Sequence, residues 1–78
     1  MANTQIIYVL EQIEYYLNKL GEPFRAKAYK TASTAIAQYP DKITTEAQLK
    51  SIKGVGDSSI KHIMEYLNTG RVTYIEKL

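Results

Sequence analysis

The 78-residue sequence predicts an all-α fold, a compact domain of four helices. Three observations lead to this prediction. Apolar residues recur at helical spacing, glycine and proline mark the expected helix ends, and no stretch shows the period-two alternation of a half-buried strand. The length fits one small domain, residues 1–78, and a hydrophobic fraction of 45% is enough for its core.

The first helix is expected from about Thr4 to Leu20, with Asn3 as its N-cap. Gly21 is a suitable residue for its C-terminal stop. One face of this segment carries an apolar stripe, which predicts that the helix packs on the core. The stripe consists of Ile6, Val9, Leu10, Ile13, Leu17 and Leu20.

The second helix is expected from about Pro23 to Gln38, because proline suits the first turn of a helix. It should end at Tyr39, since the residue before a proline is pushed out of the helical region. We expect its packed face to be made of mostly small residues. These are Phe24, Ala28, Ala32, Ala35 and Ile36.

Two shorter helices complete the prediction. The third runs from about Thr45 to Ile52, and the fourth runs from about Ser58 to Asn68 and stops at Gly70. The residues after Gly70 predict either a last helical turn or an extended tail that packs on the core. The apolar residues of this tail are Tyr74, Ile75 and Leu78.

The most informative stretch is Ile52-Lys53-Gly54-Val55-Gly56-Asp57, between the third and fourth helices. Gly54 and Gly56 allow positive φ and close approach of another group, and Asp57 is a good N-cap. Backbone N–H groups at such a turn can hold a phosphate. The pattern is that of a helix-hairpin-helix motif, which grips a nucleic-acid backbone without reading bases. By itself it is also compatible with a plain connector.

Composition and charge narrow the function classes. The net charge is only +2, but after residue 22 most charged positions are basic, which permits a nucleic-acid partner. The chain has no cysteine, so disulfides and cysteine metal sites are excluded. No apolar run approaches the roughly 20 residues that span a membrane. With no secretory signal visible, we expect an intracellular protein without a membrane partner.

Four segments, in this order and spacing, resemble the amino-terminal lyase-type domain of family X DNA polymerases, the polymerase beta-like type. The segments are Pro23–Lys30, Ile36–Ile43, Ile52–Gly56 and Leu67–Gly70. The resemblance implies binding to gapped, nicked or 5′-phosphorylated DNA in DNA repair. Other implied partners are a polymerase domain or another repair protein.

The resemblance also implies site residues. Arg25 and Tyr29 correspond to residues around a 5′-phosphate, and backbone carbonyls of Lys50, Ile52 and Val55 to ligands of a Na⁺ or K⁺ ion at the hairpin. No other cofactor is expected. The implied DNA- and phosphate-binding residues are Arg25, Tyr29, Lys53, Gly54, Val55, Gly56, Ser58, Lys61 and His62.

The sequence departs from the family where its lyase chemistry resides. Lyase-active members form a Schiff base through a lysine that corresponds to His62, and further family lysines correspond to Ser58 and Tyr74. Imidazole has no primary amine, and Lys61 is turned by roughly 100° from His62 around the helix. We therefore expect DNA binding without efficient lyase activity.

Two alternative functions stay open at this point. One is an active 5′-deoxyribose phosphate lyase that uses a displaced lysine, such as Lys61, Lys27 or Lys53. The other is a protein-interaction domain that keeps the hairpin only as structure. Salt-dependent DNA binding and covalent trapping of DNA separate these alternatives.

Overall fold

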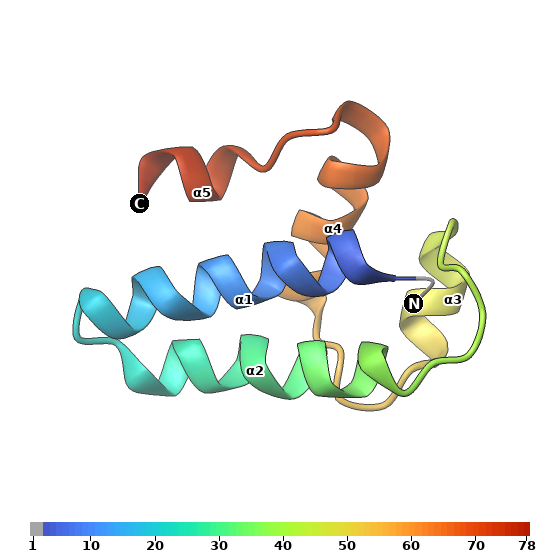
Figure 1. Cartoon of the computed structure of the whole chain (residues 1–78), viewed down its shortest axis with the longest axis horizontal. Coiled ribbons are helices and arrows are strands. Elements are labelled where there is room, and N and C mark those ends of the chain that lie inside the picture. Colours follow the sequence, from blue (N-terminus) through green and yellow to red (C-terminus); the bar gives the residue numbers. More distant parts are fainter. Residues whose placement is uncertain (1–2) are drawn as a thin grey trace.

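The computed structural model describes residues 3–78, and these residues form five helices and no strand (Figure 1). The all-α prediction is confirmed, and each of the four expected helices begins and ends within one residue of its expected bounds. The described part measures 33 × 24 × 22 Å. Its helices are α1 (Thr4–Lys19), α2 (Pro23–Ala37), α3 (Glu46–Ser51), α4 (Asp57–Thr69) and α5 (Thr73–Lys77).

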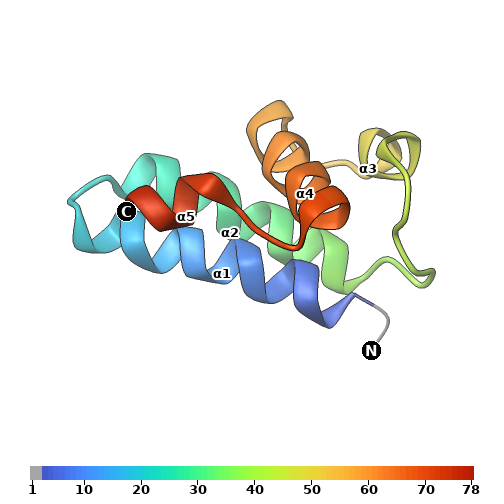
Figure 2. The ribbon, with the colours of Figure 1, turned by 90° about the horizontal axis from the view of Figure 1, so that it is seen from above.

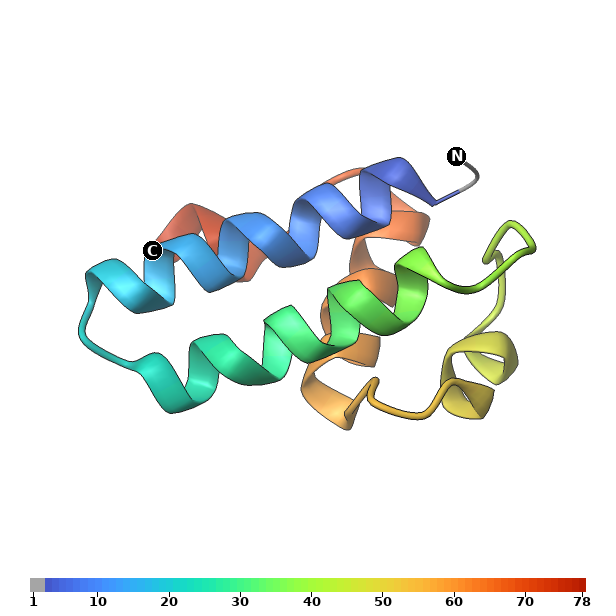
Figure 3. The same ribbon diagram turned by 60° about the horizontal axis from the view of Figure 1, so that its bottom comes forward.

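Helices α1 and α2 run antiparallel and side by side, joined by a tight turn at Gly21 (Figures 1 and 3). Gly21 has φ +78°, as expected for a glycine that ends a helix. Five of the six stripe residues of α1 are buried, but Leu20 is 58% exposed. The expectation for Leu20 was wrong because α1 ends at Lys19, and the chain turns away from the core before Leu20 can pack.

The packed face of α2 differs from the expected one. Ala32 and Ile36 are buried as expected, but Phe24 is 90% exposed and Ala28 is also exposed. Tyr29 faces the core in their place. Many alanines give this helix only a weak contrast between its faces, so the sequence pattern did not fix its rotation. The buried residues of α2 are Ala26, Tyr29, Ala32, Ser33 and Ile36.

Asn3 occupies the N-cap position of α1, but its side chain does not cap the helix. Its Nδ2 donates to the carbonyl of Asp41 at 2.9 Å, and its Oδ1 accepts from the Ile43 N–H at 2.9 Å. These two bonds tie the loop between α2 and α3 to the start of α1. They satisfy polar backbone next to Ile43, which is only 1% exposed.

Helix α3 begins with a capping box that fixes the approach to the hairpin. Thr45 Oγ1 accepts from the Gln48 N–H at 3.3 Å, and Gln48 Oε1 accepts from the Thr45 N–H at 3.0 Å. Leu49 anchors this short helix in the core. The hairpin follows, and α4 then crosses the α1–α2 pair with Ile60 and Ile63 buried against it (Figures 1 and 3).

The segment after Gly70 forms the short helix α5, so the first of the two expected alternatives is correct. Gly70 has φ +77°, and Val72 is buried directly after it. From there α5 runs along α1 in the same direction as α1 (Figures 1 and 2). Within residues 3–78, no helix is both long and apolar enough to span a membrane.

Candidate nucleic-acid interface

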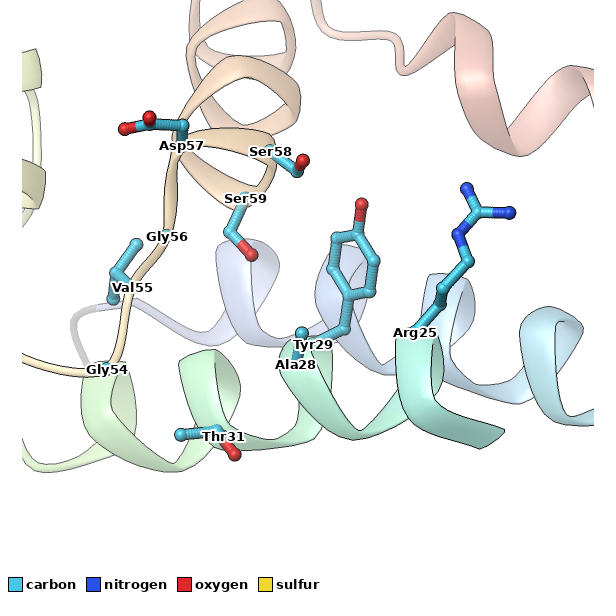
Figure 4. A pocket seen from close by; sticks show the side chains of 10 residues that line it. All are labelled: Arg25, Ala28, Tyr29, Thr31, Gly54, Val55, Gly56, Asp57, Ser58 and Ser59. Atoms are coloured by element: carbon cyan, nitrogen blue, oxygen red, sulfur yellow. The ribbon is translucent and has the colours of Figure 1, made fainter. Parts of the chain in front are cut away.

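A hollow of about 600 Å³ lies where α2, the hairpin and the start of α4 meet (Figure 4). Helix α2 forms one wall, and the hairpin and the first turn of α4 form the other. Two segments far apart in the sequence, residues 25–31 and 54–59, therefore contribute to one site. The residues that line it are Arg25, Ala28, Tyr29, Thr31, Gly54, Val55, Gly56, Asp57, Ser58 and Ser59.

The two hairpin glycines have different conformations. Gly54 has φ +102°, a region that side chains rarely adopt, so glycine is required there. A Cβ on Gly54 would also lie 3.5 Å from the side chains of Thr31 and Ala35, which shows how closely the hairpin approaches α2. Gly56 has φ −86° and open space around its Cβ position. Of the two glycines that allow positive φ, Gly54 adopts it and Gly56 does not.

The start of α4 presents free backbone donors. Gly56, rather than Asp57, is the N-cap, and its carbonyl accepts the first helical bond from the Ile60 N–H at 3.0 Å. No side chain caps this end, so the preceding N–H groups have no partner within the helix. Asp57 lies in the first turn, and Figure 4 shows its carboxylate directed away from Arg25 and Tyr29. The helix dipole makes this end attractive to an anion.

Tyr29 lies at the base of the hollow with its ring buried and its hydroxyl directed toward the first turn of α4 (Figure 4). Burial raises the pKa of Tyr29, and the nearby Tyr74 raises it further, while Arg25 and a hydrogen bond with Ser58 oppose this. The hydroxyl therefore keeps its proton at neutral pH and can donate a hydrogen bond into the hollow.

Arg25 projects from the first turn of α2 beside Tyr29 (Figure 4). Its Nη1 donates to Glu22 Oε2 at 2.8 Å, and its Nη2 donates to the Tyr74 hydroxyl at 2.5 Å. The hydrogen bond to Glu22 is the main cause of a raised pKa for Arg25. A cation at a helix start is disfavoured by the dipole, and Glu22 compensates for it here. The exposed guanidinium stays charged at the rim of the hollow.

His62 belongs to an aromatic cluster with Tyr29 and Tyr74. Its ring stacks on Tyr74 with centroids 4.8 Å apart and planes 14° apart, and its centroid lies 6.1 Å from that of Tyr29. The side chain is half-buried, and burial lowers the pKa of His62. The imidazole is thus held neutral within an aromatic cluster at neutral pH.

The hollow brings together six of the nine residues implied for DNA contact. Three others do not line it. Lys53 and Lys61 are exposed and lie within a few residues of the lining segment 54–59. His62 belongs to the aromatic cluster. The six that meet are Arg25, Tyr29, Gly54, Val55, Gly56 and Ser58.

Sequence reasoning missed several residues that build the site. Ala28 and Thr31 line the hollow because α2 is rotated relative to the expected face, and Ser59 lines it from the first turn of α4. Tyr74 contacts Arg25 from a position 49 residues away in the sequence, and no local pattern reports such a contact. The proximity of Arg25, Tyr29 and the hairpin to one another was implied only by the resemblance.

The carbonyl oxygens implied as cation ligands lie at the end of α3 and in the hairpin. The Ile52 carbonyl accepts from the Val55 N–H at 3.3 Å and keeps a second lone pair. Outside the helices of residues 3–78, no backbone N–H donates to the carbonyl of Lys50 or Val55. Carbonyl oxygens with spare lone pairs suit a hard cation. Within residues 3–78, no three or more His, Cys, Asp or Glu side chains form a group that could hold a metal ion.

Comparisons with known proteins agree with this geometry. Residues 1–72 match the family described as "Helix-hairpin-helix domain". The chain is 29% identical over 79 aligned positions to the DNA polymerase/3′-5′ exonuclease PolX of Bacillus subtilis (strain 168). It is 30% identical over 74 positions to DNA polymerase lambda of Arabidopsis thaliana.

These matches cover 100% and 95% of this chain but only 14% of each relative. The similarity to both polymerases therefore concerns one small part of their length, and the aligned part of this chain includes its hairpin. The chain belongs to the helix-hairpin-helix domain family, in the form that it shares with family X DNA polymerases.

Proposed function

We propose that this domain binds the DNA backbone at gaps, nicks or 5′-phosphate ends without reading the base sequence. Its helix-hairpin-helix domain type, shared with DNA polymerases, supports DNA binding. The observation that carries the finer proposal is that two kinds of hydrogen-bond donor for a phosphate converge on one hollow. These are the charged Arg25 with the Tyr29 hydroxyl, and the uncapped N–H groups at the start of α4.

The chemistry of the hollow suits a terminal phosphate. A guanidinium can bind two phosphate oxygens at once, a tyrosine hydroxyl can donate to a third, and the helix N-terminus favours the negative charge. Arg25 is held near this place by Tyr74 and Glu22, so little side-chain order has to be gained on binding. The hairpin on the opposite wall offers backbone for an internal phosphate of the same strand.

The lining offers little that could read bases. Reading base edges needs clusters of Arg, Asn and Gln side chains in a groove-entering element. Among the residues that line the hollow, Arg25 is the one side chain of these types, and it sits at the rim. The proposed binding is therefore insensitive to sequence.

The proposal includes the lack of efficient lyase chemistry. A Schiff base needs an unprotonated primary amine beside the sugar aldehyde. No lysine is among the residues that line the hollow, and the His62 ring is stacked on Tyr74. Lys61 is exposed, whereas His62 and Ile63 beside it are half-buried and buried, which supports a direction away from the aromatic cluster.

We also propose that the carbonyls of Lys50, Ile52 and Val55 hold Na⁺ or K⁺ when DNA is bound. Such an ion would neutralise part of the charge between the hairpin carbonyls and a phosphate oxygen. A polymerase domain or another repair protein is the partner class that we propose beside DNA, because the curated relatives are DNA polymerases.

The test is a titration of two gapped DNAs that differ only in a 5′-phosphate or a 5′-hydroxyl on the downstream strand. We expect tighter binding of the phosphorylated gap, with a log–log salt slope of roughly −2 to −4. Arg25→Gln should remove most of the preference, whereas Arg71→Gln, with the same change in charge just beyond the C-terminal end of α4, should keep it. Equal affinity of the wild type for both DNAs would refute end binding.

The lyase part is tested by borohydride trapping on an incised abasic duplex. The wild type should trap DNA only at background, and His62→Lys should raise trapping if the geometry of the cluster survives. Adding Ser58→Lys should raise it further, because Ser58 lines the hollow. Strong trapping by the wild type that disappears in Lys61→Gln would make the domain an enzyme.

A further inference from the structure

A second hollow lies on the outer face of α2 and has a volume of about 620 Å³. It shares Thr31 with the first hollow, and Gly54 of the first hollow lies against Thr31 and Ala35, which both line the second. The two hollows are therefore neighbours that meet at Thr31. The second is lined by Lys27, Lys30, Thr31, Thr34, Ala35 and Gln38.

The lining of this second hollow suits a polyanion. It contains two amines, two hydroxyls, an amide and no carboxylate, and the 15-residue α2 has no Asp or Glu at all. The ion pairs within residues 3–78 use Arg25, Lys50 and Arg71, so Lys27 and Lys30 carry charges that no carboxylate neutralises. Their spacing of three residues places both on neighbouring positions of the helix surface, about 5–6 Å apart at Cβ.

We infer that the DNA strand held at the hairpin continues across Gly54 and Thr31 into the second hollow. There Lys27 and Lys30 bind two of its internal phosphates. This inference rests on the proposed function, which places a phosphate at the hairpin. It adds a second backbone site on a face that the first hollow does not include, and it commits to a phosphodiester strand as the occupant, since repeated charge matches the paired lysines.

The site predicts a specific change in the salt dependence of binding. Each phosphate that a lysine neutralises contributes about 0.7 to 0.9 to the log–log slope. Lys27→Gln combined with Lys30→Gln should make the slope less steep by about 1.4–1.8, with the 5′-phosphate preference intact. The matched control is Lys19→Gln with Lys77→Gln, which changes the net charge equally at two residues that line neither hollow.

A position-specific measurement complements the titration. The chain contains no cysteine, so Thr34→Cys provides a single thiol for a photo-crosslinker on the wall of the second hollow. We expect crosslinks to nucleotides internal to the 5′ end. Asn18→Cys replaces an exposed, uncharged residue that lines neither hollow, and this matched control should give few of them.

The outcomes separate the two proposals. If the wild type binds neither DNA, or binds both gapped DNAs equally, the proposed function fails. If the wild type prefers the phosphorylated gap but the Lys27/Lys30 variant keeps the slope of its control, the second site is refuted alone. Binding of polyglutamate that competes with DNA and is lost in the same variant would identify an acidic peptide site instead and would also overturn the inference.

Discussion

The two ends of α4 are built in opposite ways. At its C-terminal end the polar groups are satisfied by the chain itself. Gly70 closes the helix with positive φ, Glu65 accepts hydrogen bonds from both the N–H and the hydroxyl of Thr73, and Arg71 makes a two-point ion pair with Glu76. These bonds hold α5 in place and leave few free hydrogen-bond donors for a ligand at the C-terminal end of α4.

At its N-terminal end the same helix is open. Gly56 caps it without a side chain, the N–H groups before Ile60 have no helical partner, and Asp57 makes no capping hydrogen bond. Arg25 and Tyr29 lie across the hollow from this end. Helices α1 and α2 also begin without a side-chain cap, so uncapped donors alone do not mark a site. The start of α4 differs because its donors face a hollow that Arg25 and Tyr29 also line.

The strongest comparison replaces the positive-φ glycine at each end by alanine. Gly54→Ala should destabilise the fold by about 1–3 kcal/mol, because φ +102° is strained for a side chain, and Gly70→Ala by about 1 kcal/mol. Beyond the loss of folded protein, only Gly54→Ala should weaken DNA binding. Urea denaturation and DNA titration measure the two effects. An equal loss of binding in folded Gly70→Ala would show that the two ends of α4 do not differ in their contact with DNA.

Gly56→Ala separates binding from folding at the open end. Gly56 has a β-region backbone (φ −86°, ψ 175°) and open space at its Cβ position, so alanine fits there. Alanine is a poorer N-cap than glycine but restricts the unfolded chain more, so the unfolding free energy should change by no more than about 0.5 kcal/mol. The added methyl group lies on the wall of the hollow and should weaken binding of the phosphorylated gap. The same denaturation and titration are the measurements. Normal binding by this variant would show that the backbone at Gly56 does not approach the phosphate.

Glu65→Gln tests the closed end through pH. Hydrogen bonding from Thr73 is the main cause of the lowered pKa of Glu65, so its carboxylate contributes stability above the unfolded value of 4.5. That contribution should be lost as the pH falls through the folded pKa. Thermal melts between neutral and acidic pH should show a weaker acid loss in Glu65→Gln, with Glu11→Gln as control. Identical acid profiles would mean that the hydrogen bonds from Thr73 to Glu65 contribute nothing to stability.

The smallest expected effect is on the pH dependence of stability, and it comes from His62, which lies between the two ends of α4. Burial lowers its pKa below 6.5, so between that value and the folded pKa the unfolded chain binds more protons. The contribution of the neutral His62 to the free energy of unfolding should therefore be fully present above about pH 6.5. It should be lost as the pH falls from there through the folded pKa. His62→Phe keeps a ring on Tyr74 and should flatten the profile between pH 5 and 7.5. A profile unchanged by this substitution would contradict the burial of a neutral imidazole.

The sequence predicted the helices well because their ends carry strong local signals, such as Pro23, Thr45 and Gly70. It did not predict the rotation of α2, where alanines weaken the pattern and Phe24 proved exposed. It also assigned Asn3 to a local cap, whereas the side chain bonds to a loop about 40 residues away. Tertiary partners decide such positions, and a local pattern does not contain them.

The candidate site shows the same division. The positive φ of Gly54, which makes the turn of the hairpin, follows from the local sequence. The assignment of the cap to Gly56 rather than Asp57 depends on the backbone path, and the contact between Arg25 and Tyr74 depends on how α5 packs. These features arise only when the helices are assembled, and they shape the hollow more than any single motif does.

The most direct test of the account is which end of α4 meets DNA. Amide chemical-shift changes measured by NMR, during titration with a 5′-phosphorylated gapped DNA, report on both ends in one experiment. We predict the largest changes at residues 54–59 and small changes at residues 70–73. Changes concentrated at residues 70–73, or equal at the two ends, would contradict the account.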